Sequence, residues 1–171
     1  AEDSAVTPTA IQAKPVNGCY GTEQSPPVAV GSDLFYIQRG MQGMQSIAYD
    51  ITVNGYTTTD RNLVADHLPY PGMIKSIFQK GKPDIIWVLR KDGVLLGLTY
   101  EKSENVAGWH QHKLGGSHVD DNGVTQDFGR VLSIGNMLRP GIQDQLWMVV
   151  ERVVNGQTVR TVEYLSDAPV Y

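Results

Sequence analysis

The sequence predicts a mostly β fold built from consecutive antiparallel β-meanders of the propeller-blade kind, with one short helix. Its 18 glycines and 9 prolines among 171 residues favour many turns between short strands. From Pro27 onward, short apolar runs alternate with Gly, Asn, Asp and Pro, and one strand–turn–strand unit recurs along the chain. Hydrophobic residues make up 41% and charged residues 19%, so the chain can build a packed core.

The clearest meander lies between Met73 and Leu114. The run at 85–89 is continuously apolar and rich in β-branched residues, which is typical of a strand buried on both faces. A turn at Lys91-Asp92-Gly93 follows it, because glycine tolerates the positive φ of tight hairpins. Four strands joined by tight turns make one propeller blade. The four strands are expected at 74–78, 85–89, 94–100 and 106–112.

Parts of the same unit recur on both sides of this meander, each marked by an aromatic residue in an apolar run: Phe35, Trp87 and Trp147. We therefore expect a β-meander repeat domain over residues 16–171, preceded by a linker or extended arm at 1–15. Within the domain we expect a partial blade, a full blade and a second partial blade. These cover about 18–58, 73–114 and 127–166.

The short helix is expected at residues 60–68. Asp60 can cap its first turn and Pro69 would end it. Leu63 and His67 lie one turn apart, so they would share a face that could rest on a sheet edge.

Charge and cysteine content narrow the classes of function. The formal net charge is −4 and no Lys/Arg-rich run occurs, which argues against a protein that grips the phosphate backbone but not against DNA passing along its surface. Cys19 is the single cysteine and is expected to be an inert thiol, without an intrachain disulfide. No apolar run approaches the roughly 20 residues of a membrane span.

Three histidines could in principle bind a metal ion. His110 and His112 lie two apart on a predicted strand, so their side chains leave on the same face, and His118 follows beside Asp120 and Asp121. The ordinary interpretation is a histidine pair on a strand surface, followed by a turn, and we expect no metal or cofactor. The Asp residues at 33, 92, 120 and 121 are interpreted as turn residues, whose carboxylates bind local backbone N–H groups.

Three tryptophans could form a sugar-stacking surface. Trp87 and Trp147 lie in apolar runs and are expected in the core, whereas Trp109 has small or polar neighbours and is the candidate ligand-binding residue. No phosphate-binding loop and no Gly-x-Ser-x-Gly turn occurs. We therefore expect no enzymatic activity and assign no catalytic residue.

Several segments resemble the tail tube proteins (nozzle or hub) of short-tailed bacteriophages, of the kind also described as stabilising packaged DNA. The likeness is carried by residues 85–100, by 106–112 and by 34–40, and extends over about 18–165. It implies β-propellers arranged as a ring around the DNA channel of the virion tail, without enzymatic activity. The implied partners are other tail proteins, copies of the chain itself, and DNA that passes without specific binding during ejection.

One full meander and parts of two others fall short of the four to eight blades of a closed propeller. We therefore expect a fragment of a longer protein or an obligate oligomer, since open sheet edges invite aggregation. The leading hypothesis is a structural component of a phage tail. The alternatives are a carbohydrate- or receptor-binding module of the particle, using Trp109, and a metal-dependent enzyme using His110, His112 and His118.

Overall fold

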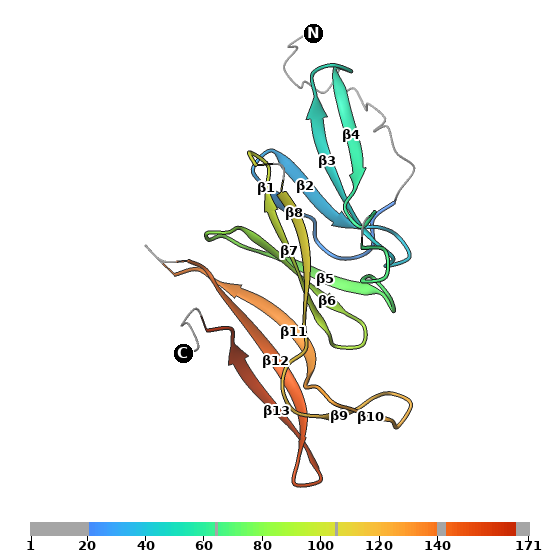
Figure 1. Ribbon diagram of the computed structural model, residues 1–171, viewed down its shortest axis with the longest axis vertical. Coiled ribbons are helices and arrows are strands. Elements are labelled where there is room, and N and C mark those ends of the chain that lie inside the picture. The colour runs from blue at the N-terminus through green and yellow to red at the C-terminus, as the bar shows by residue number, and fades with distance from the viewer. Residues whose placement is uncertain (1–20, 64, 105, 140–142, 167–171) are drawn as a thin grey trace, which may run out of the picture.

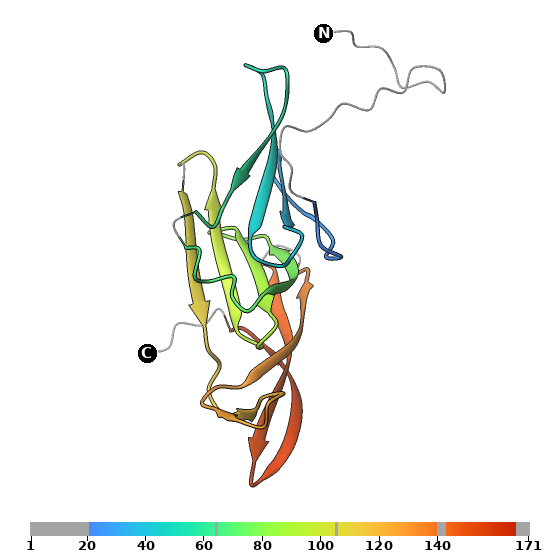
Figure 2. The same cartoon turned by 90° about the vertical axis from the view of Figure 1, so that its right-hand side faces the viewer.

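The computed structural model describes residues 21–63, 65–104, 106–139 and 143–166, and these form strands, turns and loops. The strands make three antiparallel sheets and one small hairpin, stacked along the long axis of the molecule (Figures 1 and 2). The mostly β, meander-based fold class is confirmed. The arm expected at residues 1–15 lies outside the described residues.

The first sheet has the order β1-β2-β3-β4, so it is a complete four-stranded meander rather than the partial one that was expected. Its alternating side chains divide between two faces. Phe35 and Ile37 point into the protein, and Leu34 points to the opposite side. The strands are β1 (Val28–Val30), β2 (Asp33–Ile37), β3 (Met44–Asp50) and β4 (Gly55–Asp60).

The second sheet has the order β5-β6-β7-β8 and contains the four strands predicted between Met73 and Leu114. Gly93 has a φ of 84° in the turn between β6 and β7, as the sequence predicted for that hairpin. A Cβ there would lie 2.4 Å from Cγ of Arg130, so the turn also packs closely against the third sheet. The strands are β5 (Met73–Gln79), β6 (Ile85–Arg90), β7 (Leu95–Glu101) and β8 (Val106–His112).

The third sheet has the order β11-β12-β13. Asn155 and Gly156, both with positive φ, make the turn between its second and third strands. The small hairpin of β9 (His118–Val119) and β10 (Thr125–Gln126) lies between the second and third sheets in the chain. The strands of the third sheet are β11 (Arg130–Met137), β12 (Gln145–Val154) and β13 (Gln157–Tyr164).

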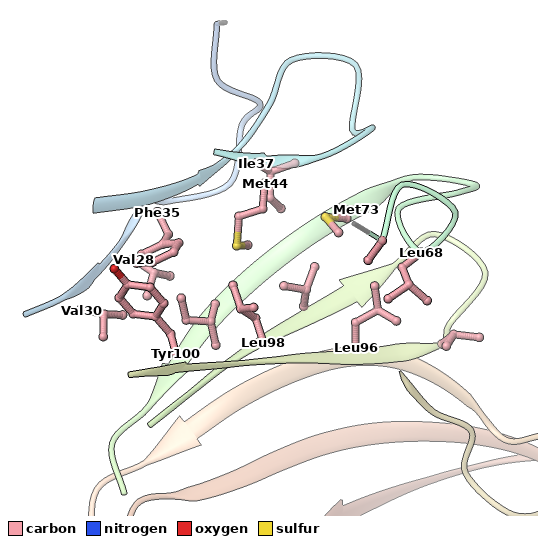
Figure 3. Close-up of a cluster of buried hydrophobic side chains, with 14 of the residues drawn as sticks. Val28, Val30, Phe35, Ile37, Met44, Leu68, Met73, Leu96, Leu98 and Tyr100 are labelled. Atoms are coloured by element: carbon pink, nitrogen blue, oxygen red, sulfur yellow. The ribbon is translucent and has the colours of Figure 1, made fainter. Parts of the chain in front are cut away.

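Two apolar cores join the three sheets. The first lies between the first and second sheets, where Phe35, Ile37 and Met44 meet Leu96 and Leu98 (Figure 3). The second lies between the second and third sheets. Its main members are Trp87, Leu89, Leu95, Ile134, Leu146, Met148 and Val150. Successive residues of β6 and β7 alternate between the two cores, so the second sheet is buried on both faces. Burial on both faces explains why the strands of this sheet have continuous apolar runs in their sequence.

The first strands of the three sheets lie side by side, because β5 contacts both β1 and β11. Lys75 on β5 donates a hydrogen bond from Nζ to the carbonyl oxygen of Ile134 on β11, at 2.7 Å. The N–H of Ser76, also on β5, donates to Oγ of Ser25, just before β1, at 3.2 Å. Polar bonds therefore link the three sheets along one edge of the stack.

The short helix predicted at 60–68 is wrong, because Asp60 ends β4 and the other described residues of this segment form turns and bends. Asp60 does bind the N–H of Asn62 at 2.8 Å, but as a turn residue. Oδ1 of Asn62 accepts a bond from the N–H of Met44 at 2.6 Å and ties the segment to β3. So short a helix has little stability of its own, and these competing bonds outweigh it. No described segment makes a helix suited to crossing a membrane.

Leu98 tests the first core. Replacing this fully buried residue (0% exposed) with Ala should lower the free energy of unfolding by about 2–5 kcal/mol, because a cavity opens between two sheets. Urea unfolding followed by circular dichroism measures the loss. Leu138→Ala is the matched control, because its side chain is 80% exposed, and it should change little. Equal losses for the two variants would contradict the packing.

Candidate functional site

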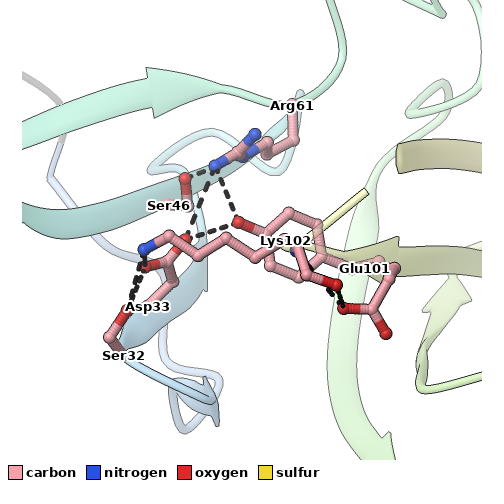
Figure 4. Close-up of polar contacts among 8 residues, drawn as sticks. Ser32, Asp33, Ser46, Arg61, Glu101 and Lys102 are labelled. Carbon is pink, nitrogen blue, oxygen red and sulfur yellow. Dashed lines mark hydrogen bonds and ion pairs between the residues drawn. The ribbon is translucent and has the colours of Figure 1, made fainter. Parts of the chain in front are cut away.

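The most elaborate polar site lies where the first and second sheets meet, around the carboxylate of Asp33 (Figure 4). Asp33 is the first residue of β2, and its side chain is only 1% exposed. The hydroxyl of Tyr100 on β7 donates a hydrogen bond to Oδ2 at 2.5 Å, and that of Ser32 donates to Oδ1 at 3.0 Å. The ammonium group of Lys102 forms an ion pair with Oδ1. The carboxylate therefore binds one group from β7 and one from the turn that follows β7.

Arg61, which follows β4, extends this network across the first sheet. Its Nε donates to Oγ of Ser46 on β3 at 2.8 Å, and its guanidinium lies 3.8 Å from Oδ2 of Asp33. The guanidinium also lies over the rings of Phe35 and Tyr100, 5.7 Å and 5.1 Å from the ring centres. Asp33, Ser46, Arg61, Tyr100 and Lys102 form what we call the Asp33 network.

The network changes the protonation of its members. Burial alone would raise the pKa of Asp33, but hydrogen bonds from Lys102, Tyr100 and Ser32 outweigh it and hold that pKa below its ordinary value. Burial and the bond to the Asp33 carboxylate raise the pKa of Tyr100 to about 12. Asp33 is therefore ionised and Tyr100 protonated across the neutral range, so the bond between them persists there.

Asp33 was predicted as a turn residue, but in the structure its carboxylate also binds Tyr100 and Lys102. Its place two residues before Phe35 puts it on the buried face of β2, which is a sequence signal for a carboxylate that needs a partner. Its partners Arg61, Tyr100 and Lys102 are distant in sequence and could not be inferred. Asp92 and Asp120 do act as turn residues, since their carboxylates accept backbone N–H bonds within four residues.

Asp33→Asn tests whether the network holds the two sheets together. The amide keeps the shape but loses the charge that pairs with Lys102 and Arg61, so we expect a loss of about 2–3 kcal/mol in the free energy of unfolding. Asp121→Asn is the control. The Asp121 carboxylate pairs with Arg130 but is 75% exposed, so that variant should unfold like the parent protein. Indistinguishable urea midpoints for the two variants would refute the role of Asp33.

Trp109, the candidate ligand-binding residue, lies on β8 and is only partly exposed. Its indole Nε1 donates a hydrogen bond to the carbonyl oxygen of Arg61 at 2.7 Å, and its ring packs against the first core. Ala107, on the same face of β8, borders a pocket of about 320 Å³ above the Asp33 network. Trp109 thus helps to join the two sheets and keeps part of its ring surface accessible.

His110 and His112 also lie on β8, on the face opposite Trp109, as their spacing predicted. Nδ1 of His110 and Nε2 of His112 are hydrogen-bonded at 2.7 Å. Both rings make T-shaped contacts with the ring of Trp87, with ring centres 5.6 Å and 5.2 Å apart. A Cβ on Gly97 would lie 2.1 Å from the ring of His110, so only glycine allows this approach.

Burial lowers the pKa of both histidines, and the neighbouring His112 lowers that of His110 further. His118 is placed elsewhere, in β9, where its buried ring is hydrogen-bonded through Nδ1 to the carbonyl oxygen of Phe128 at 2.7 Å. The structure therefore brings together two of the three histidines. Among the described residues, no group of three His, Cys, Asp or Glu side chains could hold a metal ion.

The histidine pair predicts that acid destabilises the fold. Because both pKa values are lower in the folded state, the unfolded chain binds more protons, and stability should fall as the pH drops below about 6.5. Urea unfolding at several pH values from about 7.5 to about 5 measures this dependence. A His110→Gln, His112→Gln double variant should show a weaker dependence. His67→Gln changes a histidine at an exposed position and should not weaken this dependence. A double variant that keeps the parental dependence would contradict the assignment.

Comparison with known proteins identifies no relative of the chain. No protein-family model matches the sequence, and a search of curated proteins finds no match. The geometry of the described residues therefore supplies the structural observations that bear on function. In that geometry, the Asp33 network and the histidine pair both direct their polar groups toward residues of the same chain.

Proposed function

We propose that the chain is a structural component of a bacteriophage tail, in the tail tube, nozzle or hub, and that it acts through protein–protein contacts around the DNA channel. The observation that carries the proposal is the stack of three meanders whose first strands lie side by side. Successive blades of a β-propeller are arranged in this way. The likeness of residues 85–100 and 106–112 to tail tube proteins supports the same assignment.

A scaffold in a tail must keep its shape under load, and the interior of the chain suits that demand. Two apolar cores and the Asp33 network hold the middle sheet on both faces. The polar groups of Asp33, Tyr100 and Trp109 are directed to partners within the protein. Such groups stabilise an inter-sheet contact rather than await a substrate, which favours a structural role over an enzymatic one.

The net charge of the chain suits a protein that lines a DNA channel. A formal net charge of −4 and a pI of about 5.5 give little attraction for phosphate groups. A channel wall that bound DNA through many Lys and Arg contacts would slow its passage during ejection. We therefore propose that DNA passes this protein without specific binding, in the tail of the virion.

The location of the chain in virions tests the proposal. Antibodies raised against the purified chain should label the tails of phage particles that carry its gene, as seen by immunogold electron microscopy. The label should remain with isolated tails after the heads are removed, with particles of an unrelated phage as the control. Virions without the chain, or label confined to the head, would contradict the proposal.

A carbohydrate- or receptor-binding module is the second candidate, favoured by the partial exposure of Trp109 and by a pocket of about 320 Å³ that Arg61 and Ala107 help to line. Aromatic rings next to polar groups are common in such sites. An array of bacterial surface glycans distinguishes the two functions, and the structural proposal expects no binding. Binding that is lost in Trp109→Ala but kept in Trp147→Ala would replace the structural proposal with this one.

A further inference from the structure

The hairpin of β3 and β4 projects beyond the rest of the described chain at one end of the long axis (Figures 1 and 2). The strand pairing explains this projection. β2 pairs with β3 only as far as Leu34 and Ile47, whereas β3 and β4 remain paired up to Asp50 and Gly55. The end of the hairpin, residues 48–57, is therefore only two strands wide. We call these residues the hairpin tip.

The hairpin tip exposes large apolar side chains. Ile51 is 85% exposed and Val53 is 54% exposed, both in the turn that joins the two strands. Tyr49 and Tyr56 pair across the strands just behind this turn, and each ring is about half exposed. The two rings meet edge to face, with their centres 5.6 Å apart. A single exposed apolar residue is ordinary, but four on one narrow projection form a patch of the kind that marks an interaction site.

The polarity of the hairpin changes in steps along its length. The aliphatic residues Ile51 and Val53 lie at its end, the two tyrosines follow, and the threonines at 57–59 come next. Asp50, beside the tyrosines, is the only charged residue of the hairpin tip. A lipid bilayer has the same order from its interior outward, with acyl chains, an interface in which Tyr and Trp are enriched, and then water. The hairpin tip therefore matches the polarity profile of a membrane surface.

Several polar groups of the hairpin tip are bonded within the tip itself. The hydroxyl of Tyr49 donates a hydrogen bond to Oδ1 of Asn54 at 2.6 Å, and the N–H of Asn54 donates to the carbonyl oxygen of Ile51 at 3.3 Å. Oδ1 of Asp50 accepts a bond from the N–H of Thr52 at 2.8 Å. The interior of a bilayer offers no hydrogen-bond partners, so polar groups that enter it must already be paired. These internal bonds lower the cost of moving the tip out of water.

We propose that the hairpin tip inserts into the surface of a lipid membrane. Ile51 and Val53 enter the acyl chains, while Tyr49 and Tyr56 lie at the level of the headgroups, where amphipathic rings are favoured. The shape of the tip favours lipid over a protein partner. A stable protein interface buries about 800 Å² on each side, which so narrow a projection supplies only inside a matching groove. A lipid surface needs no such groove. This membrane contact goes beyond the assembly role proposed above.

The charge of the hairpin determines the kind of membrane contact. Residues 44–60 contain two Asp and neither Lys nor Arg. The contact therefore depends on the burial of apolar side chains and gains nothing from anionic lipids. We expect one copy to bind weakly, to bind neutral lipid at least as well as anionic lipid, and to respond little to salt. Adsorption through basic residues elsewhere on the chain would show the opposite dependence on lipid charge and salt.

Flotation with lipid vesicles tests the proposal. At millimolar lipid, the parent chain should float with phosphatidylcholine vesicles, to the same extent at low and high salt. Ile51→Asp should lower the partition coefficient roughly tenfold with an unchanged circular dichroism spectrum, because the most exposed apolar side chain no longer enters the lipid. Leu138→Asp is the matched control, because Leu138 is 80% exposed outside the hairpin, and should bind like the parent. No binding by the parent, binding only to vesicles that contain phosphatidylglycerol, or equal losses in the two variants would overturn the proposal.

Fluorescence quenching identifies the part of the chain that enters the lipid. Ile51→Trp places an indole ring at the end of the hairpin, and vesicles of phosphatidylcholine brominated on its acyl chains should quench its emission. The three native tryptophans lie outside the hairpin, so the emission of the parent chain should not change. Equal quenching in the parent would show that another surface enters the lipid, and the proposal would be wrong. Labelling of phage tails does not depend on these outcomes, so the proposed function can stand or fall separately.

Discussion

The fold depends on one constraint, which is that the middle sheet is apolar on both faces. Ile86 and Val88 point to one side of β6, while Trp87 and Leu89 point to the other. Such a sheet cannot face water on either side, and burying each of these side chains contributes roughly 1.5–3 kcal/mol. The first and third sheets pack on these two faces and exclude water from them.

Apolar surfaces alone would let the sheets slide over one another, and the polar contacts fix their positions. Asp33 can meet Tyr100, Lys102 and Arg61 together in only one arrangement of the first sheet on the second. Lys75 sets the third sheet against β5 in a similar way through the carbonyl group of Ile134. These bonds lie between sheets, so they link local strand pairing to the geometry of the whole stack. A rigid, oriented stack is what an assembly role requires.

The sequence predicted the parts of the structure that local patterns determine. The strands and turns of the middle meander, the shared face of His110 and His112, and the turn at Asn155-Gly156 all follow from side-chain periodicity and turn chemistry. The helix at 60–68 failed because Asn62 bonds to β3, a contact distant in sequence. The Asp33 network was missed for the same reason, since its partners lie 28 to 69 residues away. Trp147 was placed in a core because the pattern of β12 matches that of β6, and only tertiary structure shows that it is partly exposed and lies outside the second core.

The most direct test of a middle sheet covered on both faces is native-state hydrogen exchange of the backbone amides. The account predicts that amides of β6 and β7 exchange only through global unfolding, with the highest free energies in the chain. Amides of β2 and β12, which cover them, should approach the same value because the three sheets unfold together. If the amides of β6 and β7 exchange as readily as those of the exposed strands β4 and β13, the middle sheet is not held between two covers and the account is wrong.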